Sequence, residues 1–134
     1  MIRLGSLAGY PFEGPRVLGG WTAPAVAAVY AVLYKPDPHA QPERYAVIYV
    51  DHADDLSALR FPFRHPRAGC WIARAGDRWK LYICTYEVPG GLRSHRELIV
   101  RELSATYRPS CNTVQYGSAW RDEWIGGERL PDEL

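Results

Sequence analysis

The chain has 134 residues, of which 47% are hydrophobic and 23% are charged, as expected for one globular domain with its own core. The formal net charge of +1 excludes a whole-protein electrostatic attraction to DNA or to a membrane, although it permits a local basic surface. The longest apolar run, residues 23–34, is too short to span a bilayer, and we expect no membrane partner.

The cysteines indicate free thiols. Cys70, Cys84 and Cys111 are odd in number and widely spaced, which argues against a disulfide framework or a zinc site. Buried thiols in a reducing compartment are the simpler interpretation, and the first residues do not have the pattern of a signal peptide. We therefore expect a cytoplasmic protein.

The first half of the chain predicts an arm followed by two strands. Residues 1–25 are rich in Gly and Pro and are expected to form an irregular arm. Residues 28–34 and 45–51 are apolar at consecutive positions, as in strands that are covered on both faces. The connection, residues 35–44, contains three prolines and is too short for a helical crossover, so we expect an antiparallel hairpin.

The second half predicts two short helices, a third strand and a long helix. Residues 54–59 and 66–75 are expected to be helical, the second ending at Gly76. Residues 79–87 are rich in aromatic and β-branched side chains and predict a strand. Residues 94–108 have apolar residues at helical spacing.

The long helix begins with a possible capping box, in which Ser94 and Glu97 would satisfy free backbone amides. Residues 115–134 are expected to form a short helix and a polar tail that packs on or trails the same domain. The fold class is thus α/β (α+β), with a small three-stranded, mainly antiparallel sheet flanked by helices.

The order of elements and several short motifs resemble the GIY-YIG nuclease superfamily over residues 26–114. The two family triplets would correspond to Ala-Val-Tyr at 28–30 and Tyr-Val-Asp at 49–51. The segment Cys70-Trp71 through Gly76 is similar to one in many bacterial members. The most specific match is the end of the long helix with Pro109-Ser-Cys-Asn112.

The resemblance implies hydrolysis of a phosphodiester by water, assisted by one divalent cation such as Mg²⁺. In the family, the two tyrosines, here Tyr30 and Tyr49, approach the water and the phosphate, and the asparagine, here Asn112, orders the site. An arginine and a metal-binding glutamate complete the family's site. Such groups meet the charge that accumulates on the phosphate oxygens.

Three positions depart from the family pattern. Val100 stands where the family has its metal-binding glutamate, and Leu59 stands where it has the arginine. Arg60 is adjacent to Leu59 and is the candidate replacement. Asp51 replaces the glycine of the second triplet, and it is a better candidate metal ligand than Glu97 or Glu102 on the long helix. His52 lies where some members place a general base, although an exposed loop histidine is the simpler interpretation.

Residues 60–80 form a basic segment that is opposed only by Asp77. Arginines interleaved with aromatic side chains suit phosphate contacts combined with base stacking. A solvated surface is the alternative. The candidate nucleic-acid-binding residues are Arg60, Arg64, Arg67, Trp71, Arg74, Arg78 and Lys80.

These patterns lead to three hypotheses. The first is a catalytically impaired nuclease-like domain that binds nucleic acid or a protein partner. The second is an active metal-dependent endonuclease with rearranged catalytic residues, for which the candidates are Tyr30, Tyr49, His52, Arg60 and Asn112. The third is a structural subunit with an exposed aromatic patch drawn from Tyr10, Phe12, Trp21, Trp120 and Trp124.

Overall fold

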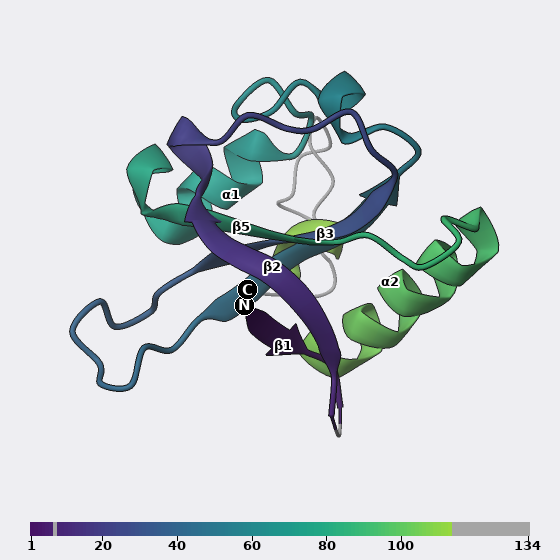
Figure 1. Cartoon of the computed structure of the whole chain (residues 1–134). Coiled ribbons are helices and arrows are strands. Elements are labelled where there is room, and N and C mark those ends of the chain that lie inside the picture. The colour runs from purple at the N-terminus through teal and green to yellow at the C-terminus, as the bar shows by residue number, and fades with distance from the viewer. Residues whose placement is uncertain (7, 114–134) are drawn as a thin grey trace.

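The computed structural model describes residues 1–6 and 8–113, which form an α+β fold around a curled antiparallel sheet (Figure 1). The sheet has five strands in the order β1-β2-β5-β3-β4. Their bounds are β1 (Ile2–Leu4), β2 (Tyr10–Val17), β3 (Ala28–Tyr34), β4 (Ala46–Ala53) and β5 (Leu81–Tyr86). Each neighbouring pair is antiparallel.

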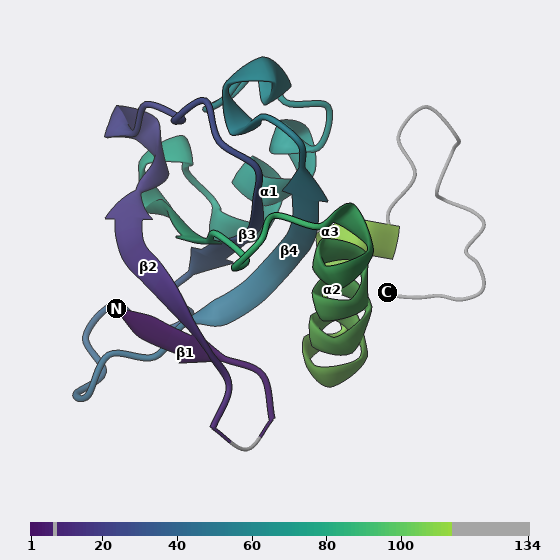
Figure 2. The same cartoon turned by 45° about the vertical axis from the view of Figure 1, so that its right-hand side comes forward.

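Two helices cover opposite faces of the sheet (Figure 2). The helix α1 (Ala68–Ala75) packs on one face through Trp71, and α2 (Arg93–Tyr107) packs on the other through Ile99 and Leu103. A single further turn, α3 (Ser110–Thr113), lies against β4. Three 3-10 turns complete the elements: η1 (Leu18–Gly20), η2 (Leu56–Leu59) and η3 (Arg78–Lys80).

The central strand β3 is buried on both faces, as its unbroken apolar sequence predicts. Ala28, Tyr30 and Val32 belong to the core on the α1 side, and the residues between them belong to the core on the α2 side. The predicted antiparallel hairpin is confirmed, since Tyr30 pairs with Asp51 across β3 and β4. The end of α1 at Gly76 is also confirmed: this residue has a positive φ of 87° and its N–H bonds to the Ile72 carbonyl.

The sheet has five strands rather than the three expected, because the supposed arm forms β1 and β2. Two of the Gly and Pro residues that suggested irregular structure lie at an interruption of the β2–β5 ladder. The register shifts between Glu13 and Arg16, which accommodates Gly14 and Pro15. A Cβ on Gly14 would lie 2.9 Å from the Ile83 carbonyl oxygen, so the close approach of β5 requires glycine there.

The helical predictions needed smaller corrections. Residues 54–59 form only the 3-10 turn η2, and the third strand begins at Leu81 after η3. The expected capping box is absent: α2 begins at Arg93 with Leu92 as its N-cap, and the Glu97 carboxylate bonds to the Arg93 side chain instead. The expected helix and tail within 115–134 lie outside the described residues.

The prediction of three free thiols was wrong, because Cys70 and Cys111 form a disulfide while Cys84 is buried and free. The two bonded residues are 41 apart in sequence and meet because α1 and α3 both pack beside β4. Disulfides are typical of oxidising compartments, so the cysteines no longer support a cytoplasmic location. Within the described residues, every helix is too short or too polar to cross a membrane.

The disulfide generates a stability prediction. Replacing both Cys70 and Cys111 with Ser should lower the free energy of unfolding by about 4 kcal/mol, since a loop of this length loses closure entropy in the unfolded chain. Urea unfolding with and without dithiothreitol measures the effect. The Cys84→Ala variant is the control, because it should remain sensitive to the reductant. A wild-type midpoint that does not move on reduction would contradict the prediction.

Candidate functional site

The two predicted tyrosines meet on the α1 side of the sheet. Tyr30 comes from β3 and Tyr49 from β4, and their ring centroids are 6.0 Å apart. Both side chains are buried, Tyr30 completely and Tyr49 nearly so. Trp71 of α1 contacts Tyr49 with a centroid distance of 5.4 Å and closes the cluster.

His65, which the sequence did not single out, completes this cluster. It lies in the connection between η2 and α1 and is only 8% exposed. Its Nδ1 accepts the backbone N–H of Arg67 at 3.0 Å, so the neutral ring carries its proton on Nε2. That nitrogen lies 2.9 Å from the Tyr30 hydroxyl oxygen and donates to it. Burial lowers the pKa of His65 to about 4, and the nearby charge of Arg67 acts in the same direction.

A second hydrogen bond links Tyr49 to a carboxylate. The Tyr49 hydroxyl donates to Oδ2 of Asp51 at 3.0 Å, and the Tyr49 ring lies beside that of Tyr30. The other carboxylate oxygen of Asp51 accepts the N–H of His52 at 2.8 Å. Burial raises the pKa of both tyrosines, so both remain neutral donors. Two hydrogen-bonded pairs, His65 with Tyr30 and Tyr49 with Asp51, therefore lie side by side in the cluster.

Asn112 is hydrogen-bonded to β4, the strand that carries Tyr49 and Asp51. Its side-chain oxygen accepts the N–H of Val50 at 2.8 Å, and its amide nitrogen donates to the Val50 carbonyl at 2.7 Å. Val50 lies between Tyr49 and Asp51, and Cys111 beside Asn112 is bonded to Cys70 of α1. The short helix α3 is thus held to β4 by two hydrogen bonds and to α1 by a covalent bond.

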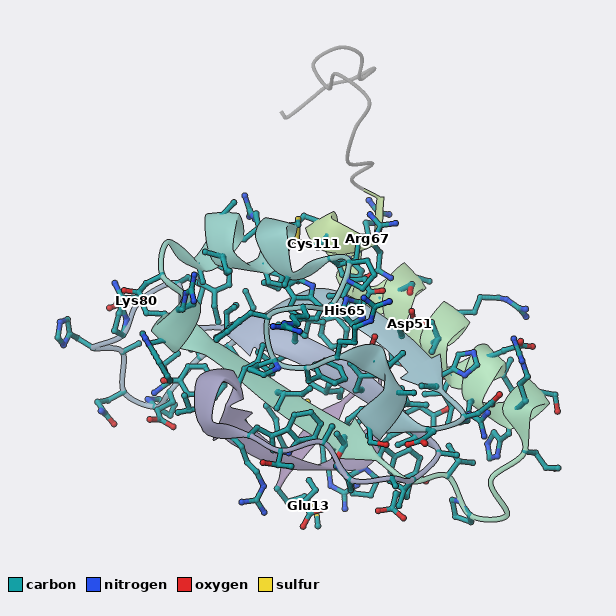
Figure 3. The ribbon with its side chains drawn as sticks, turned by 90° about the horizontal axis from the view of Figure 1, so that it is seen from above. Glu13, Asp51, His65, Arg67, Lys80 and Cys111 are labelled. Carbon is teal, nitrogen blue, oxygen red and sulfur yellow. A yellow bond between two sulfur atoms is a disulfide. The ribbon has the colours of Figure 1, made fainter. Side chains whose placement is uncertain are left out.

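Arg67 brings a positive charge to the same end of the molecule. Its charge lowers the pKa of both Tyr49 and His65, although burial dominates the shifts of these two groups. Arg67, His65, Asp51 and Cys111 lie near one another in Figure 3, whereas Lys80 and Glu13 lie toward other sides. The cluster thus combines neutral buried donors with a half-buried carboxylate and a half-buried guanidinium.

His52 lies on the opposite face of the sheet from Asp51, because side chains alternate along a strand. Its Nδ1 accepts a hydrogen bond from Nε of Arg96 at 3.3 Å. Arg96 of α2 is 2% exposed and also pairs with Asp54. His52 is therefore separated from the tyrosines. A hollow of about 410 Å³ adjoins it, and its lining includes Asp51, His52, Asp54, Asp55, Leu59 and Arg93.

The two positions that depart from the family pattern are occupied by packed aliphatic side chains. Leu59 packs on the α1-side core and Val100 on the α2-side core. Arg60 ends η2 in the left-handed conformation with φ 64°, and its side chain is exposed. The glutamates of α2 are engaged elsewhere: Glu97 pairs with Arg93, and Glu102 accepts the Tyr10 hydroxyl.

The described part of the chain contains no group of three or more His, Cys, Asp or Glu side chains that could hold a metal ion. Asp51 as a metal ligand stays a prediction. Mg²⁺ is often held by only one or two carboxylates, with waters and substrate phosphates as its other ligands. Asp51 would then supply the protein's contribution.

Five of the seven candidate nucleic-acid-binding residues are exposed, and two are not. Trp71 is fully buried, so its ring has no free face, and Arg67 is half-buried. The other five cations are exposed and form no ion pair with any residue in the described ranges. These five are Arg60, Arg64, Arg74, Arg78 and Lys80.

The aromatic residues of the third hypothesis do not form an exposed patch where they are described. Phe12 is fully buried, and Tyr10 and Trp21 are half-buried. Trp120 and Trp124 lie outside the described residues. In the described part of the chain, the large aromatic residue that is exposed is Trp79, with 60% of its surface accessible to solvent.

The pKa of His65 predicts how stability changes with pH. Because the folded-state pKa is about 4, below the ordinary value of 6.5, the unfolded chain binds a proton that the folded chain excludes. The free energy of unfolding should therefore fall as the pH drops from about 6.5 to 4, by about 2 kcal/mol after allowance for solvent screening. Urea unfolding across this range measures it. The variant His65→Gln does not titrate, and an equally steep pH dependence in that variant would contradict the assignment.

No family model, no curated protein and no solved structure matches this chain.

Proposed function

We propose that this chain is a GIY-YIG-nuclease-like domain with impaired catalysis that binds nucleic acid through residues 60–80. The observation that carries the proposal is the set of five exposed cations in this segment that form no ion pair with a described residue. Phosphates are the natural counter-charges for such a surface.

Impaired catalysis is supported by what replaces the family's charged groups. Phosphodiester cleavage needs a cation and preorganised donors to meet the charge that develops on the phosphate. The corresponding positions hold Leu59 and Val100, both of which pack on the core. The Tyr30 hydroxyl is fully buried and already has a hydrogen-bond partner in His65. Binding therefore needs fewer assumptions than cleavage.

A charge-deletion series tests the binding function. The triple variant Arg60→Ala, Arg64→Ala, Arg74→Ala should bind fluorescently labelled DNA or RNA more weakly than wild type. It should also reduce the slope of log K against log salt by about two to three, since each lost phosphate contact releases one counterion fewer. Fluorescence anisotropy between low and physiological salt measures both quantities.

The matched control removes three exposed cations from other elements, in the variant Arg3→Ala, Arg16→Ala, Arg101→Ala. Net charge changes equally in the two triple variants, so only a localised binding surface distinguishes them. Equal losses of affinity in both would exclude a specific basic surface. If wild-type protein binds neither DNA nor RNA at low salt, the nucleic-acid function is wrong and a protein partner becomes the ligand to seek.

A second candidate, a metal-dependent endonuclease, is favoured by one contact. The Asp51 carboxylate accepts the Tyr49 hydroxyl, which puts a carboxylate next to the tyrosine pair. It would serve as the ligand that Val100 cannot provide, with phosphate oxygens and waters completing the coordination of Mg²⁺.

Plasmid nicking tests this candidate. Conversion of supercoiled plasmid to open circles should require Mg²⁺ or Mn²⁺ and should be abolished by Asp51→Asn and by Tyr49→Phe. The variant Tyr82→Phe, which changes a tyrosine on the α2 side of the sheet, is the control and should remain active. The absence of nicking by wild-type protein with either metal would eliminate the endonuclease and leave the binding function in place.

A further inference from the structure

Trp79 is held in a fixed position despite its exposure. The side-chain oxygen of Asp77 accepts the Trp79 backbone N–H at 2.8 Å and caps η3. The Trp79 ring lies against Gly19 of η1. A Cβ at that glycine would be only 2.3 Å from a carbon of the ring. Phe63 contacts the ring edge-on, with a centroid distance of 6.4 Å and an interplanar angle of 82°. These contacts support the ring from the protein side and leave 60% of the residue open to solvent.

Trp79 is flanked in the sequence by two cationic residues, Arg78 and Lys80. The Arg78 guanidinium lies 5.1 Å from the centroid of Phe63, the ring that supports Trp79. Lys80 follows in the same turn and lines a small hollow of about 80 Å³ together with Lys35 and Tyr82. Lys80 lies well away from Asp51 in Figure 3, so this surface is separate from the buried tyrosine cluster. An exposed indole between cations is complementary to a base with its adjoining phosphates.

We propose that Trp79 is a stacking platform for an unpaired base, and hence that the ligand is single-stranded nucleic acid. The inference rests on the proposed nucleic-acid binding and narrows its substrate class. In a duplex the faces of the bases are already stacked on one another, so an exposed indole has no base face to meet. In a single strand each base has a free face, and stacking on an aromatic side chain adds affinity with little dependence on sequence.

Substitution of the ring separates stacking from charge. Trp79→Ala should weaken binding of a labelled oligothymidine about five- to a hundredfold, while the salt slope stays unchanged because no phosphate contact is lost. A blunt-ended duplex of equal charge should lose less than about twofold. Trp79→Phe should retain most of the affinity, whereas Trp79→Leu should behave as Trp79→Ala, since leucine is apolar but has no aromatic face.

Two further variants control for structure. Gly19→Ala pushes the ring from its support without altering it, and it should weaken single-strand binding to an intermediate extent. Leu98→Ala removes a comparably exposed apolar side chain from α2 and should have no effect. Circular dichroism and thermal melting verify that each variant is folded. If Trp79→Ala does not fold, the comparison of Trp79→Phe with Trp79→Leu decides.

The outcomes distinguish this inference from the function on which it rests. If wild-type protein binds nucleic acid and Trp79→Ala binds the oligothymidine equally well, stacking is excluded while phosphate binding stands. An equal loss for single strand and duplex also excludes stacking on an unpaired base. If wild-type protein binds neither form at low salt, both the function and the inference are overturned.

Discussion

The pairing of β3 with β4 on one side and β5 on the other is the constraint on which the rest of the structure depends. Because β3 is buried on both faces, each of its side chains must join one of two separate cores. Tyr30 therefore faces α1, and its two strand neighbours face α2. The alternation extends to the paired strand: Tyr49 and Asp51 share the face of Tyr30, and His52 takes the other. A register slip of one residue would exchange these roles.

On the outer edge of β4, side chains rather than another strand satisfy backbone hydrogen-bonding groups. Asn112 supplies one donor and one acceptor to Val50, as a neighbouring strand would, and the Asp51 carboxylate accepts the next outward N–H, that of His52. Since Cys111 is joined to Cys70, this closure is also tied covalently to α1. Tyr49 and Asp51 consequently lie on the part of β4 whose outward backbone groups are hydrogen-bonded to side chains. The two hydrogen bonds of Asn112 therefore position the backbone between these two side chains.

Elements with a local cause in the sequence were predicted, whereas features that depend on contacts between distant segments were not. The apolar run of β3 and the glycine at the end of α1 each have a local physical cause, so the sequence alone located them. The pairing of β2 with β5 joins segments about seventy residues apart, and the Gly and Pro residues of β2 suggested a loop because their bulge depends on β5. The disulfide and His65 escaped notice for the same reason. His65 lies in a Phe-Pro-Phe-Arg-His-Pro-Arg segment, and its apolar neighbours were the one available sign of burial.

The buried tyrosine cluster and the exposed basic segment differ in what they can offer a ligand. In the cluster, the Tyr30 hydroxyl accepts from His65 and the Tyr49 hydroxyl donates to Asp51, so an incoming phosphate would have to break bonds that the fold already uses. A low pKa keeps His65 neutral, which denies the phosphate a compensating charge there. On the basic segment, by contrast, the exposed cations and Trp79 give up only water when a ligand binds. Of the two regions, the exposed basic segment is therefore the one where an anionic ligand would break fewer contacts within the protein.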